Sequence, residues 1–290
     1  MKLELLQVTG SFKPRGAITR LLSMSSKAQQ QGLTAVSAGN HAAAVAYAAK
    51  VFSTTAKVVM PRSANPARIE LCRTLGADVV ITETVHEAFE RVLLISEDEN
   101  RTVVHPFEGQ NVALGTATIA LEFFRRVNGS LDAIIVPVGG GGLISGICWL
   151  SKQMHPQTQV FAVEPYGADS LYRSLQSGKP EHLERVDTIA DSLGSPYASE
   201  SHFESIQKNI DEVVRIDDEA MCHAMYLLFN KAKLAVEPAG AAATAALLGP
   251  LSERLRGKKV GLVICGGNID PDNFNRYIQQ GKRLEERLCT

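Results

Sequence analysis

The stretch "DAIIVPVGGGGL" (residues 132–143) joins an apolar run to four consecutive glycines. An apolar run of this length is typical of a strand that is buried on both faces of a parallel sheet. Because Gly139–Gly142 have no Cβ atoms, their backbone N–H groups can converge on one point. The helix expected after them adds the positive end of its dipole. The stretch therefore predicts a phosphate-binding turn between a strand and a helix.

Two better-known phosphate motifs do not fit this stretch. No Gly-Lys-Ser/Thr triplet follows the glycines, as a P-loop requires. A nicotinamide fingerprint belongs on the first strand of its domain, with an acidic residue after the second strand. The plain alternative is a flexible turn, but a buried strand that runs directly into four glycines favours the phosphate cradle.

The pattern outside this stretch alternates between short apolar runs and amphipathic segments, which predicts parallel sheets flanked by helices. A strand-like run at Leu5–Val8 ends at Thr9-Gly10, and Ser11 is a candidate helix cap. Eight strands are more than one compact open sheet needs, so two α/β domains are expected. The strands are expected at 33–37, 56–60, 77–82, 102–106, 132–138, 159–165, 212–216 and 259–265, with helices at 41–52, 65–76, 117–127 and 217–233.

The composition narrows the class of protein. With 30 basic and 31 acidic residues and no basic stripe, neither nucleic acid nor an anionic membrane is an expected partner. No apolar run reaches the length of a membrane span. The five cysteines are scattered singly and no secretory leader precedes them, which favours a reduced, cytoplasmic setting.

One lysine stands in an unusual context. In "GSFKPRGA" (10–17), Lys13 lies between Phe12 and Pro14 at the start of an expected helix, whereas most lysines lie in water on helix faces. A sheltered lysine together with a phosphate cradle indicates an aldehyde cofactor that carries a phosphate. Pyridoxal phosphate fits, with Lys13 as its covalent attachment point and Phe12 as an apolar surface beside the ring.

A second strand-to-helix turn, "AVSAGNHA" (35–42), offers polar groups for a ligand. Asn40 suits a hydrogen bond to a ligand oxygen, although asparagine is also common in left-handed turns, and the residues alone leave both interpretations open. His41 is a candidate base, but a histidine that only borders the loop is the favoured interpretation.

Five motifs in order extend the interpretation. "GSFKPRGA", "SAGNHA", "VGGGGL", "VEPAGAAA" and "CGGN" resemble the serine/threonine dehydratases, which are fold type II pyridoxal phosphate enzymes with a tryptophan synthase β-like fold. Serine racemase belongs to the same family. The resemblance covers essentially the whole chain.

The resemblance implies a role for each motif residue. Lys13 would be the Schiff-base lysine, with Phe12 against the ring. Cys265 would face the pyridine nitrogen, with Glu237 nearby. The remaining implied contacts are Asn40 with the phenolic oxygen, Gly139, Gly140, Gly141, Gly142 and Leu143 with the phosphate, and Ser37, Ala38, Gly39, Asn40 and His41 with the substrate carboxylate.

Two of these residues favour elimination over racemisation. A thiol at Cys265 cannot keep the pyridine nitrogen protonated as a carboxylate would, so the ring stabilises a free carbanion less. β-Elimination avoids a long-lived carbanion because the leaving group departs as the proton is removed. Racemisation also needs a second acid/base, which in serine racemase is a serine at the position of Ala38.

The stretch "EPYGADS" (164–170) resembles the cation site of the family. The resemblance implies that Glu164, the carbonyl of Ala168 and the Ser170 side chain bind one ion, with carbonyls of Leu193 and Ser195 completing the shell. A single carboxylate favours a monovalent ion such as K⁺ over Mg²⁺. The alternative is a strand-end glutamate that makes an ordinary contact.

The expected protein is therefore a two-domain dehydratase. Residues 1–30 and 111–290 would form a large cofactor-binding domain and residues 31–110 a small inserted one. The leader that family members carry before this point is expected to be absent, and "LGTATIALE" (114–122) replaces the usual "GQGT" motif.

The expected reaction converts L-threonine and/or L-serine to a 2-oxo acid and ammonia by β-elimination. The alternatives are a serine or hydroxyaspartate racemase/dehydratase and a non-catalytic relative that binds pyridoxal phosphate. The partner would be a small amino-acid substrate, and a homodimer is typical of the family.

Overall fold

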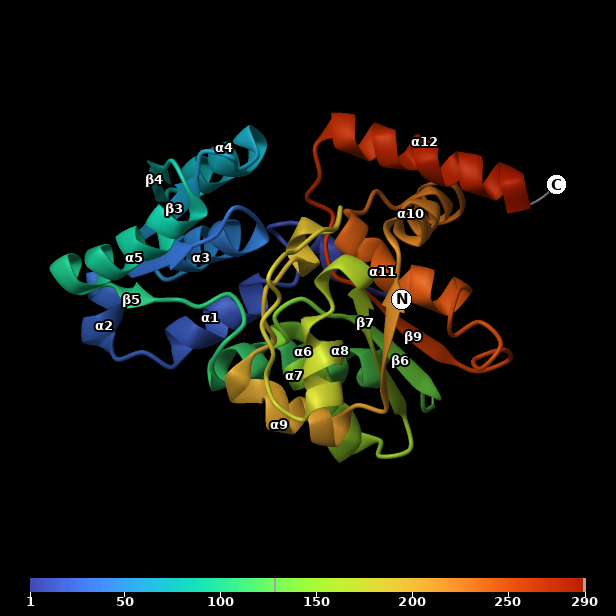
Figure 1. The fold of residues 1–290 in the computed structure, drawn as a ribbon. Helices are drawn as coiled ribbons and strands as arrows, with labels where there is room; N and C mark the ends of the chain where they lie inside the picture. The colour runs from blue at the N-terminus through green and yellow to red at the C-terminus, as the bar shows by residue number, and fades with distance from the viewer. Residues whose placement is uncertain (128, 289–290) are drawn as a thin grey trace.

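The computed structural model describes residues 1–127 and 129–288, and these form two parallel β-sheets (Figure 1). The larger sheet has the strand order β1-β9-β6-β7-β8 and the smaller has the order β4-β3-β2-β5. The strands of the larger sheet are β1 (Lys2–Leu3), β6 (Ala133–Pro137), β7 (Gln159–Pro165), β8 (Glu212–Ile216) and β9 (Val260–Ile264). Those of the smaller are β2 (Leu33–Val36), β3 (Ala56–Pro61), β4 (Asp78–Thr82) and β5 (Thr102–Val103).

Helices cover both faces of the larger sheet. The alanine-rich helix α11 (Pro238–Leu248) packs directly on β6, β7, β8 and β9 on one face. On the other face α7 (Gly142–Met154) contacts β6 and β7 and packs against α6 (Gln110–Arg126). The central strands β6 and β7 are therefore almost entirely buried, which agrees with their uninterrupted apolar sequences.

The smaller sheet also has a core on each face. Along β3, Val58 and Met60 join one cluster with α3 (Asn40–Val51), while Val59 between them joins another with α5 (Val85–Glu99). This alternation is the two-residue period of a strand. The sheet and its helices lie to one side of the larger sheet in Figure 1. The domain limits expected at residues 30 and 110 stay a prediction.

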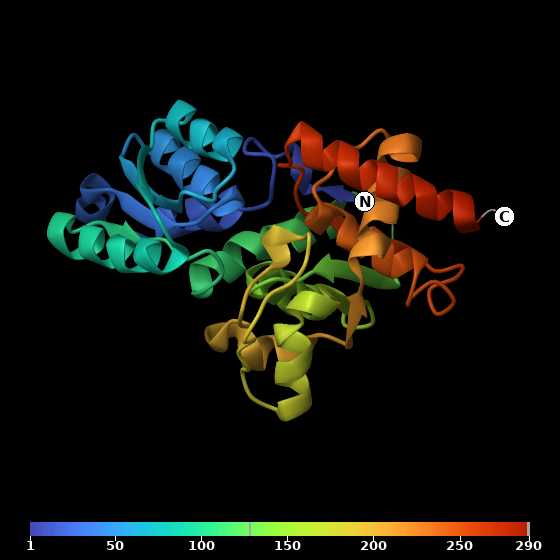
Figure 2. The same cartoon turned by 45° about the horizontal axis from the view of Figure 1, so that its top comes forward.

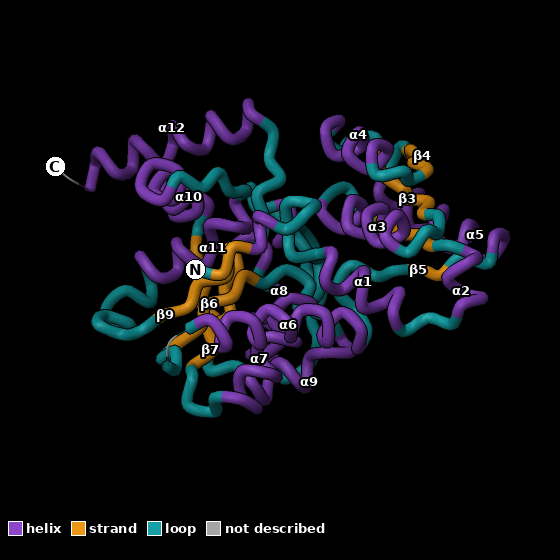
Figure 3. Tube along the Cα trace, turned by 180° about the vertical axis from the view of Figure 1, so that it is seen from behind, coloured by secondary structure: helices purple, strands orange, loops and turns teal. Residues whose placement is uncertain are grey.

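The remaining helices connect and enclose these layers. Figure 2 shows α12 running across α10 at the C-terminal end of the chain, and Figure 3 shows the same layers from behind. None of the described helices is long and apolar enough to cross a membrane. The helices not yet given are α1 (Pro14–Leu22), α2 (Ser26–Gln31), α4 (Pro66–Thr74), α8 (Ser170–Ser177), α9 (Glu200–Asn209), α10 (Asp218–Ala232) and α12 (Pro271–Leu288), with 3₁₀ turns η1 (Glu4–Leu6), η2 (Tyr166–Ala168) and η3 (Asp191–Leu193).

The N-terminal segment differs from the sequence prediction. The run Leu5–Val8 is not a strand, because the chain pairs with β9 only at Lys2–Leu3 and then forms the turn η1. The side chain that is buried there is Glu4, which forms ion pairs with Lys2 and Arg15. The apolar residues Leu5, Leu6 and Val8 therefore gave a misleading strand signal.

Two helix starts were also predicted wrongly. Ser11 does not cap α1, whose N-terminal flanking residue is Lys13. Helix α6 begins at Gln110, seven residues before the predicted start, because its first two turns are stabilised by packing rather than by an apolar stripe visible in the sequence. One of the five single cysteines, Cys289, lies outside the described residues.

Residues from the two ends of the chain meet beside β9. The Phe12 N–H donates to the carbonyl of Cys265 over 3.1 Å, and the Gly267 N–H donates to Gly10 over 2.9 Å. Ser11 and Gly266 form an isolated antiparallel bridge between these two bonds. This pairing places Lys13 next to the end of the last strand.

Candidate active site

A cavity lies where the carboxyl ends of β6 and β9 meet the starts of α1, α3 and α11. Ligand sites of open α/β sheets lie at such strand ends. The cavity brings together every residue that the resemblance assigned to the cofactor, although these residues come from five separate segments. They are Phe12, Lys13, Asn40, Gly139, Gly140, Gly141, Gly142, Leu143, Glu237 and Cys265, joined by Phe107, Pro137, Ser192, Leu193 and Ala239.

Lys13 is held inside this cavity. Its Nζ donates to the carbonyl of Pro106 over 2.8 Å and lies 5.1 Å from the centroid of the Phe12 ring. Burial lowers the pKa of Lys13 to about 8, and the neighbouring Cys265 and Glu237 only partly oppose this. Roughly a tenth of Lys13 is therefore a neutral, nucleophilic amine at pH 7, which is far more than for a lysine in water.

The glycine turn fits tightly among its neighbours. A Cβ on Gly139 would lie 3.1 Å from the carbonyl oxygen of Ser192, and one on Gly140 would lie 2.4 Å from the Phe107 ring. Gly141 precedes α7 with φ of +91°, a conformation that favours glycine. Larger residues would therefore displace the walls of the cavity.

The N–H groups of this turn are available to a ligand. Within residues 1–127 and 129–288, no hydrogen bond is found from the backbone N–H groups of residues 139–143, whereas that of Ser145 already donates to the carbonyl of Gly141. Free N–H groups at a helix N-terminus beside a cavity are the arrangement that binds phosphate. The cavity therefore fits pyridoxal phosphate at two separated points, the amine of Lys13 and this turn.

Asn40 is fixed in orientation by its partners. Its Oδ1 accepts from Asn268 Nδ2 over 2.8 Å, and its Nδ2 donates to the two carboxylate oxygens of Glu237 over 2.9 and 3.2 Å. Asn40 is the first residue of α3 and does not adopt the left-handed conformation that was the alternative. The Nδ2 group therefore lies at the cavity wall as a hydrogen-bond donor.

Glu237 and Cys265 are both shifted toward their neutral forms. Burial raises the pKa of Glu237 to about 7, with a smaller contribution from the negative charge of Asp191, although Arg68 lies 3.9 Å from its carboxylate. Burial also raises the pKa of the Cys265 thiol, whose Sγ donates to the carbonyl of Ala239 over 3.3 Å. The residue predicted to face the pyridine nitrogen is thus a neutral thiol.

The substrate turn is divided between two environments. Ser37 Oγ accepts from the Gly39 N–H over 3.1 Å, which shapes the turn. Ala38 lines a neighbouring hollow that shares Glu237 with the cavity. His41 is buried with Nε2 2.7 Å from the carbonyl of Val104, and burial lowers its pKa to about 3. His41 is therefore neutral and packed behind this turn, and its expected part in binding the substrate carboxylate stays a prediction.

Three of the residues expected to bind a cation, Glu164, Ala168 and Ser170, lie at the start of α8. Both oxygens of Glu164 accept backbone N–H groups, from Leu171 over 2.9 Å and Tyr172 over 2.8 Å, and burial raises its pKa to about 8. Ser170 Oγ is buried without a hydrogen-bond partner. Ala168 is buried beside it, and the carbonyl of Leu193 accepts from the Ser195 N–H over 2.9 Å. Glu164 thus already serves as the cap of a helix.

Four residues of the site were not found by sequence reasoning. Ser192 and Phe107 line the cavity, while Asn268 and Arg68 hold its polar wall. Asn268 ends the motif "CGGN" and Ser192 adjoins the predicted Leu193, so the sequence offered a signal for both residues. Arg68 bonds to Asp191 over 2.6 Å and to the Asn268 carbonyl over 2.8 Å, contacts between segments that no local pattern reveals.

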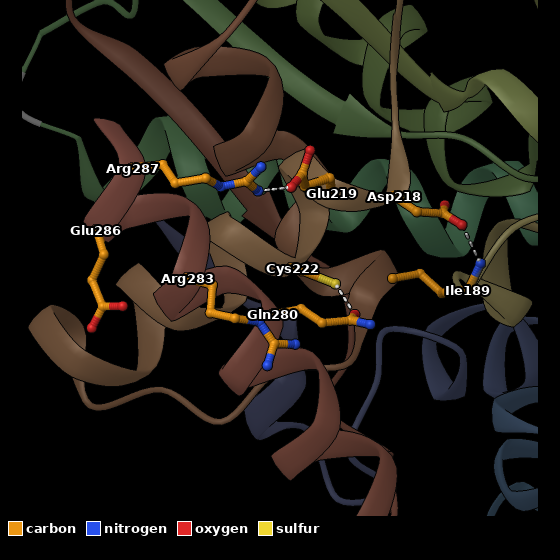
Figure 4. A pocket seen from close by; sticks show the side chains of 8 residues that line it. All are labelled: Ile189, Asp218, Glu219, Cys222, Gln280, Arg283, Glu286 and Arg287. Atoms are coloured by element: carbon orange, nitrogen blue, oxygen red, sulfur yellow. Dashed lines mark hydrogen bonds and ion pairs between the residues drawn. The ribbon is translucent and has the colours of Figure 1, made fainter. Parts of the chain in front are cut away.

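A more open hollow lies elsewhere in the molecule. Figure 4 shows it between α10 and α12, where Arg287 pairs with Glu219 and Cys222 bonds to Gln280. Its charged side chains come from both helices and are of both signs, which suits the pairing of two helices. It shares no residue with the cavity around Lys13.

Comparison with known proteins agrees with this geometry. A family model described as pyridoxal-phosphate dependent enzyme matches residues 1–266. Phenylserine dehydratase of Ralstonia pickettii is 47% identical over 280 residues, which are 97% of this chain and 86% of that protein. L-threonine ammonia-lyase of Thermotoga maritima is 40% identical over 97% of this chain and 70% of its own length. Serine racemase of Dictyostelium discoideum is 37% identical over 96% of this chain and 86% of its own length.

The fold is similar to that of solved structures. A crystal structure of the T.th. threonine deaminase superposes with a TM-score of 0.88 and 38% identity, covering 93% of this chain and 87% of that one. The sequence prediction of a fold type II architecture is confirmed.

Proposed function

We propose, from the premise that this chain belongs to the family of pyridoxal-phosphate dependent enzymes, that it is a lyase that converts a β-hydroxy-α-amino acid to a 2-oxo acid and ammonia. The observation that carries the proposal is the cavity that is lined both by Lys13 and by the turn with the free N–H groups of residues 139–143. An amine and a phosphate cradle in one cavity are what this cofactor needs.

Each residue of the cavity has a role in this reaction. Bound pyridoxal phosphate would withdraw electrons from the Cα–H bond of the substrate. Lys13 would be its covalent attachment point and, once released, the base that takes the α-proton, a role for which a pKa of about 8 suits it. Asn40 Nδ2 would donate to the phenolic oxygen, while Phe12 and Cys265 would enclose the ring without adding charge.

The turn at residues 37–41 would hold the substrate carboxylate. Ser37 and the first N–H groups of α3 supply donors there, and the helix dipole favours an anion. Ala38 carries no proton, which favours elimination over inversion at Cα. The neighbouring hollow that contains Ala38 leaves space for the β-substituent. Similar proteins are named for phenylserine and for L-threonine. The test therefore includes phenylserine, threonine and serine, which carry a phenyl group, a methyl group and no substituent on Cβ.

The second candidate is a racemase. It is favoured by the similarity to a serine racemase and disfavoured by Ala38. Chiral chromatography of a serine reaction distinguishes the two: a lyase forms pyruvate faster than D-serine, and a racemase the reverse. A relative that binds cofactor without turnover would form neither.

We also propose a K⁺ site at Glu164, Ala168 and Ser170, with carbonyls of Leu193 and Ser195 nearby. The unpartnered Ser170 Oγ and the raised pKa of Glu164 support it, because a cation would stabilise the buried carboxylate. A cytoplasmic homodimer, the state typical of the family, completes the proposal. Light scattering on the purified protein measures the oligomer.

The experiment that tests the function combines a spectrum with a product assay. The protein should bind pyridoxal phosphate with a visible absorption band, and borohydride reduction followed by peptide mapping should place the cofactor on Lys13. A 2-oxo acid should then form from serine, threonine or phenylserine. A reduced adduct on another lysine, or no product from any of the three, would overturn the proposal.

A further inference from the structure

Ser192 lies in the wall of the cofactor cavity, although none of the five motifs contains it. It is the middle residue of the turn η3 (Asp191–Leu193), which packs against the glycine turn. Its carbonyl oxygen and the Cα of Leu193 each lie 3.1 Å from the position that a Cβ on Gly139 would occupy. The backbone of Ser192 is therefore packed closely against the glycine turn.

The hydroxyl of Ser192 joins the polar network of Asn40. It accepts from Asn40 Nδ2 over 3.3 Å and donates to Asp191 Oδ1 over 3.4 Å. The hydroxyl has one proton, and when this proton turns from Asp191 toward Glu237 it favours the charged form of the Glu237 carboxylate. Asn40 joins the other two residues in one set at the cavity wall, because its Nδ2 group donates to both Ser192 and Glu237.

We infer that Ser192 is a positioning residue for the cofactor, because its hydroxyl accepts from the Asn40 amide, which also binds the Glu237 carboxylate, and so helps to hold this set beside the phenolic edge of pyridoxal phosphate. The inference rests on the proposed function, since it presupposes that this cofactor occupies the cavity. If the inference holds, Ser192 contributes to the affinity for the cofactor. It also influences the pH at which the spectrum of the bound cofactor changes.

The sign of the pH effect follows from the hydrogen bond. A donor to a carboxylate favours its charged form, so removing the Ser192 hydroxyl raises the pKa of Glu237 further. The spectral change that follows this carboxyl then moves to higher pH. The other charged or titratable groups facing Glu237 are Arg68 on α4, Asp191 on η3, Lys13 before α1 and Cys265 after β9.

The test compares four proteins freed of cofactor and titrated with pyridoxal phosphate. They are the unaltered protein, Ser192→Ala, Ser192→Thr, which keeps a hydroxyl, and the control Ser201→Ala. Ser201 is an exposed serine that donates to Glu108 and does not line the cofactor cavity. The dissociation constant, the spectrum of bound cofactor between about pH 5.5 and 9, and the melting temperature of the cofactor-free protein are measured.

Ser192→Ala should bind the cofactor about two- to tenfold more weakly, which is the loss of one hydrogen bond. Its spectral midpoint should move to higher pH, while Ser192→Thr and Ser201→Ala stay near the unaltered protein. An unchanged dissociation constant and midpoint in Ser192→Ala would overturn the inference. So would a Thr variant as impaired as the Ala variant, or an effect confined to the melting temperature. If the unaltered protein itself binds no cofactor, the proposed function fails first.

Discussion

Two buried glutamates at the carboxyl edge of the larger sheet have raised pKa values, yet their surroundings differ. Glu164 lies near the end of β7, and both of its oxygens accept backbone N–H groups of α8. Glu237 precedes α11, accepts from the side chain of Asn40 and lines a cavity. Backbone donors fix a helix start, whereas side-chain donors can respond to a ligand. A raised pKa therefore shows only that a carboxyl group is buried. Its hydrogen-bond donors indicate whether that carboxyl group has a structural or a functional role.

The largest expected effect tests whether the cavity that Glu237 shares with Lys13 is the site of the reaction. Lys13→Ala should lower the rate of 2-oxo acid formation by about 10²–10⁴ or more, because the base that takes the α-proton is lost. Lys152→Ala is the matched control, since Lys152 bonds to Thr158 and Asp211 at the far end of β7. Steady-state assays should show the control unchanged. An equal loss of rate in both variants would mean that Lys13 has no special role in the reaction.

The next effect concerns Glu164. Glu164→Gln should destabilise the protein by about 1–3 kcal/mol, because an amide replaces one of two acceptor oxygens and leaves an N–H of α8 unpaired. Denaturant unfolding with and without bound cofactor measures it. A stable variant that loses activity instead would assign Glu164 to the functional class.

The same variant carries a pH signature. Folding raises the pKa of Glu164 from 4.5 to about 8, so the folded protein keeps a proton that the unfolded chain releases. Stability from this group is full below about pH 4.5 and is lost as the pH rises through about 8. Glu164→Gln should therefore show a flatter fall of the unfolding free energy across this window. An identical slope in both proteins would contradict the assignment.

Glu237→Gln should have the reverse profile of Glu164→Gln. A neutral amide of the same shape can stay in place near pH 7, where Glu237 is itself partly protonated, so the unfolding free energy should change by less than about 1 kcal/mol. The spectrum of bound cofactor should lose its pH dependence near pH 7, and turnover should fall. Absorbance titration and the product assay check both outcomes. A large loss of stability with an unchanged spectrum would make the two glutamates equivalent.

The last effect is that of the ion, and its size depends on the ion concentration. K⁺ should stabilise the protein, by about 2.7 kcal/mol at a hundredfold excess over the dissociation constant, and Na⁺ should do so less. Melting curves at constant ionic strength measure it, and Glu164→Gln should abolish the preference. A response that survives this substitution, or a clear preference for Mg²⁺, would place the ion elsewhere.

The sequence predicted the sheets well because buried parallel strands are continuous apolar runs. Seven of the eight expected strands lie within one or two residues of their predicted limits, and the eighth, at 102–106, shrinks to Thr102–Val103. The short strand β1 escaped detection because two residues carry no pattern. The run Leu5–Val8 misled because Leu6 and Val8 are exposed rather than buried.

The residues of the site could be predicted from the sequence only where they belong to a local motif. Lys13, Asn40 and the four glycines stand in turns whose residue types are unusual in themselves. Arg68 and Ser192 gain their importance from segments far away in the chain, which meet them only in the folded molecule. No spacing rule connects Arg68 with Asp191 or Ser192 with Asn40, so these contacts needed the structure.

The pairing of Phe12 with Cys265 has a consequence for biosynthesis. Lys13 is made early, but Glu237 and Cys265, which complete the wall around it, are made more than 220 residues later. At a ribosomal rate of about 5–20 residues per second, that interval lasts roughly 10–50 seconds. The nascent chain therefore exposes its reactive lysine long before it has a finished pocket. Cofactor loading by the completed site must be among the last events in the maturation of this protein, after the final strand has joined the sheet.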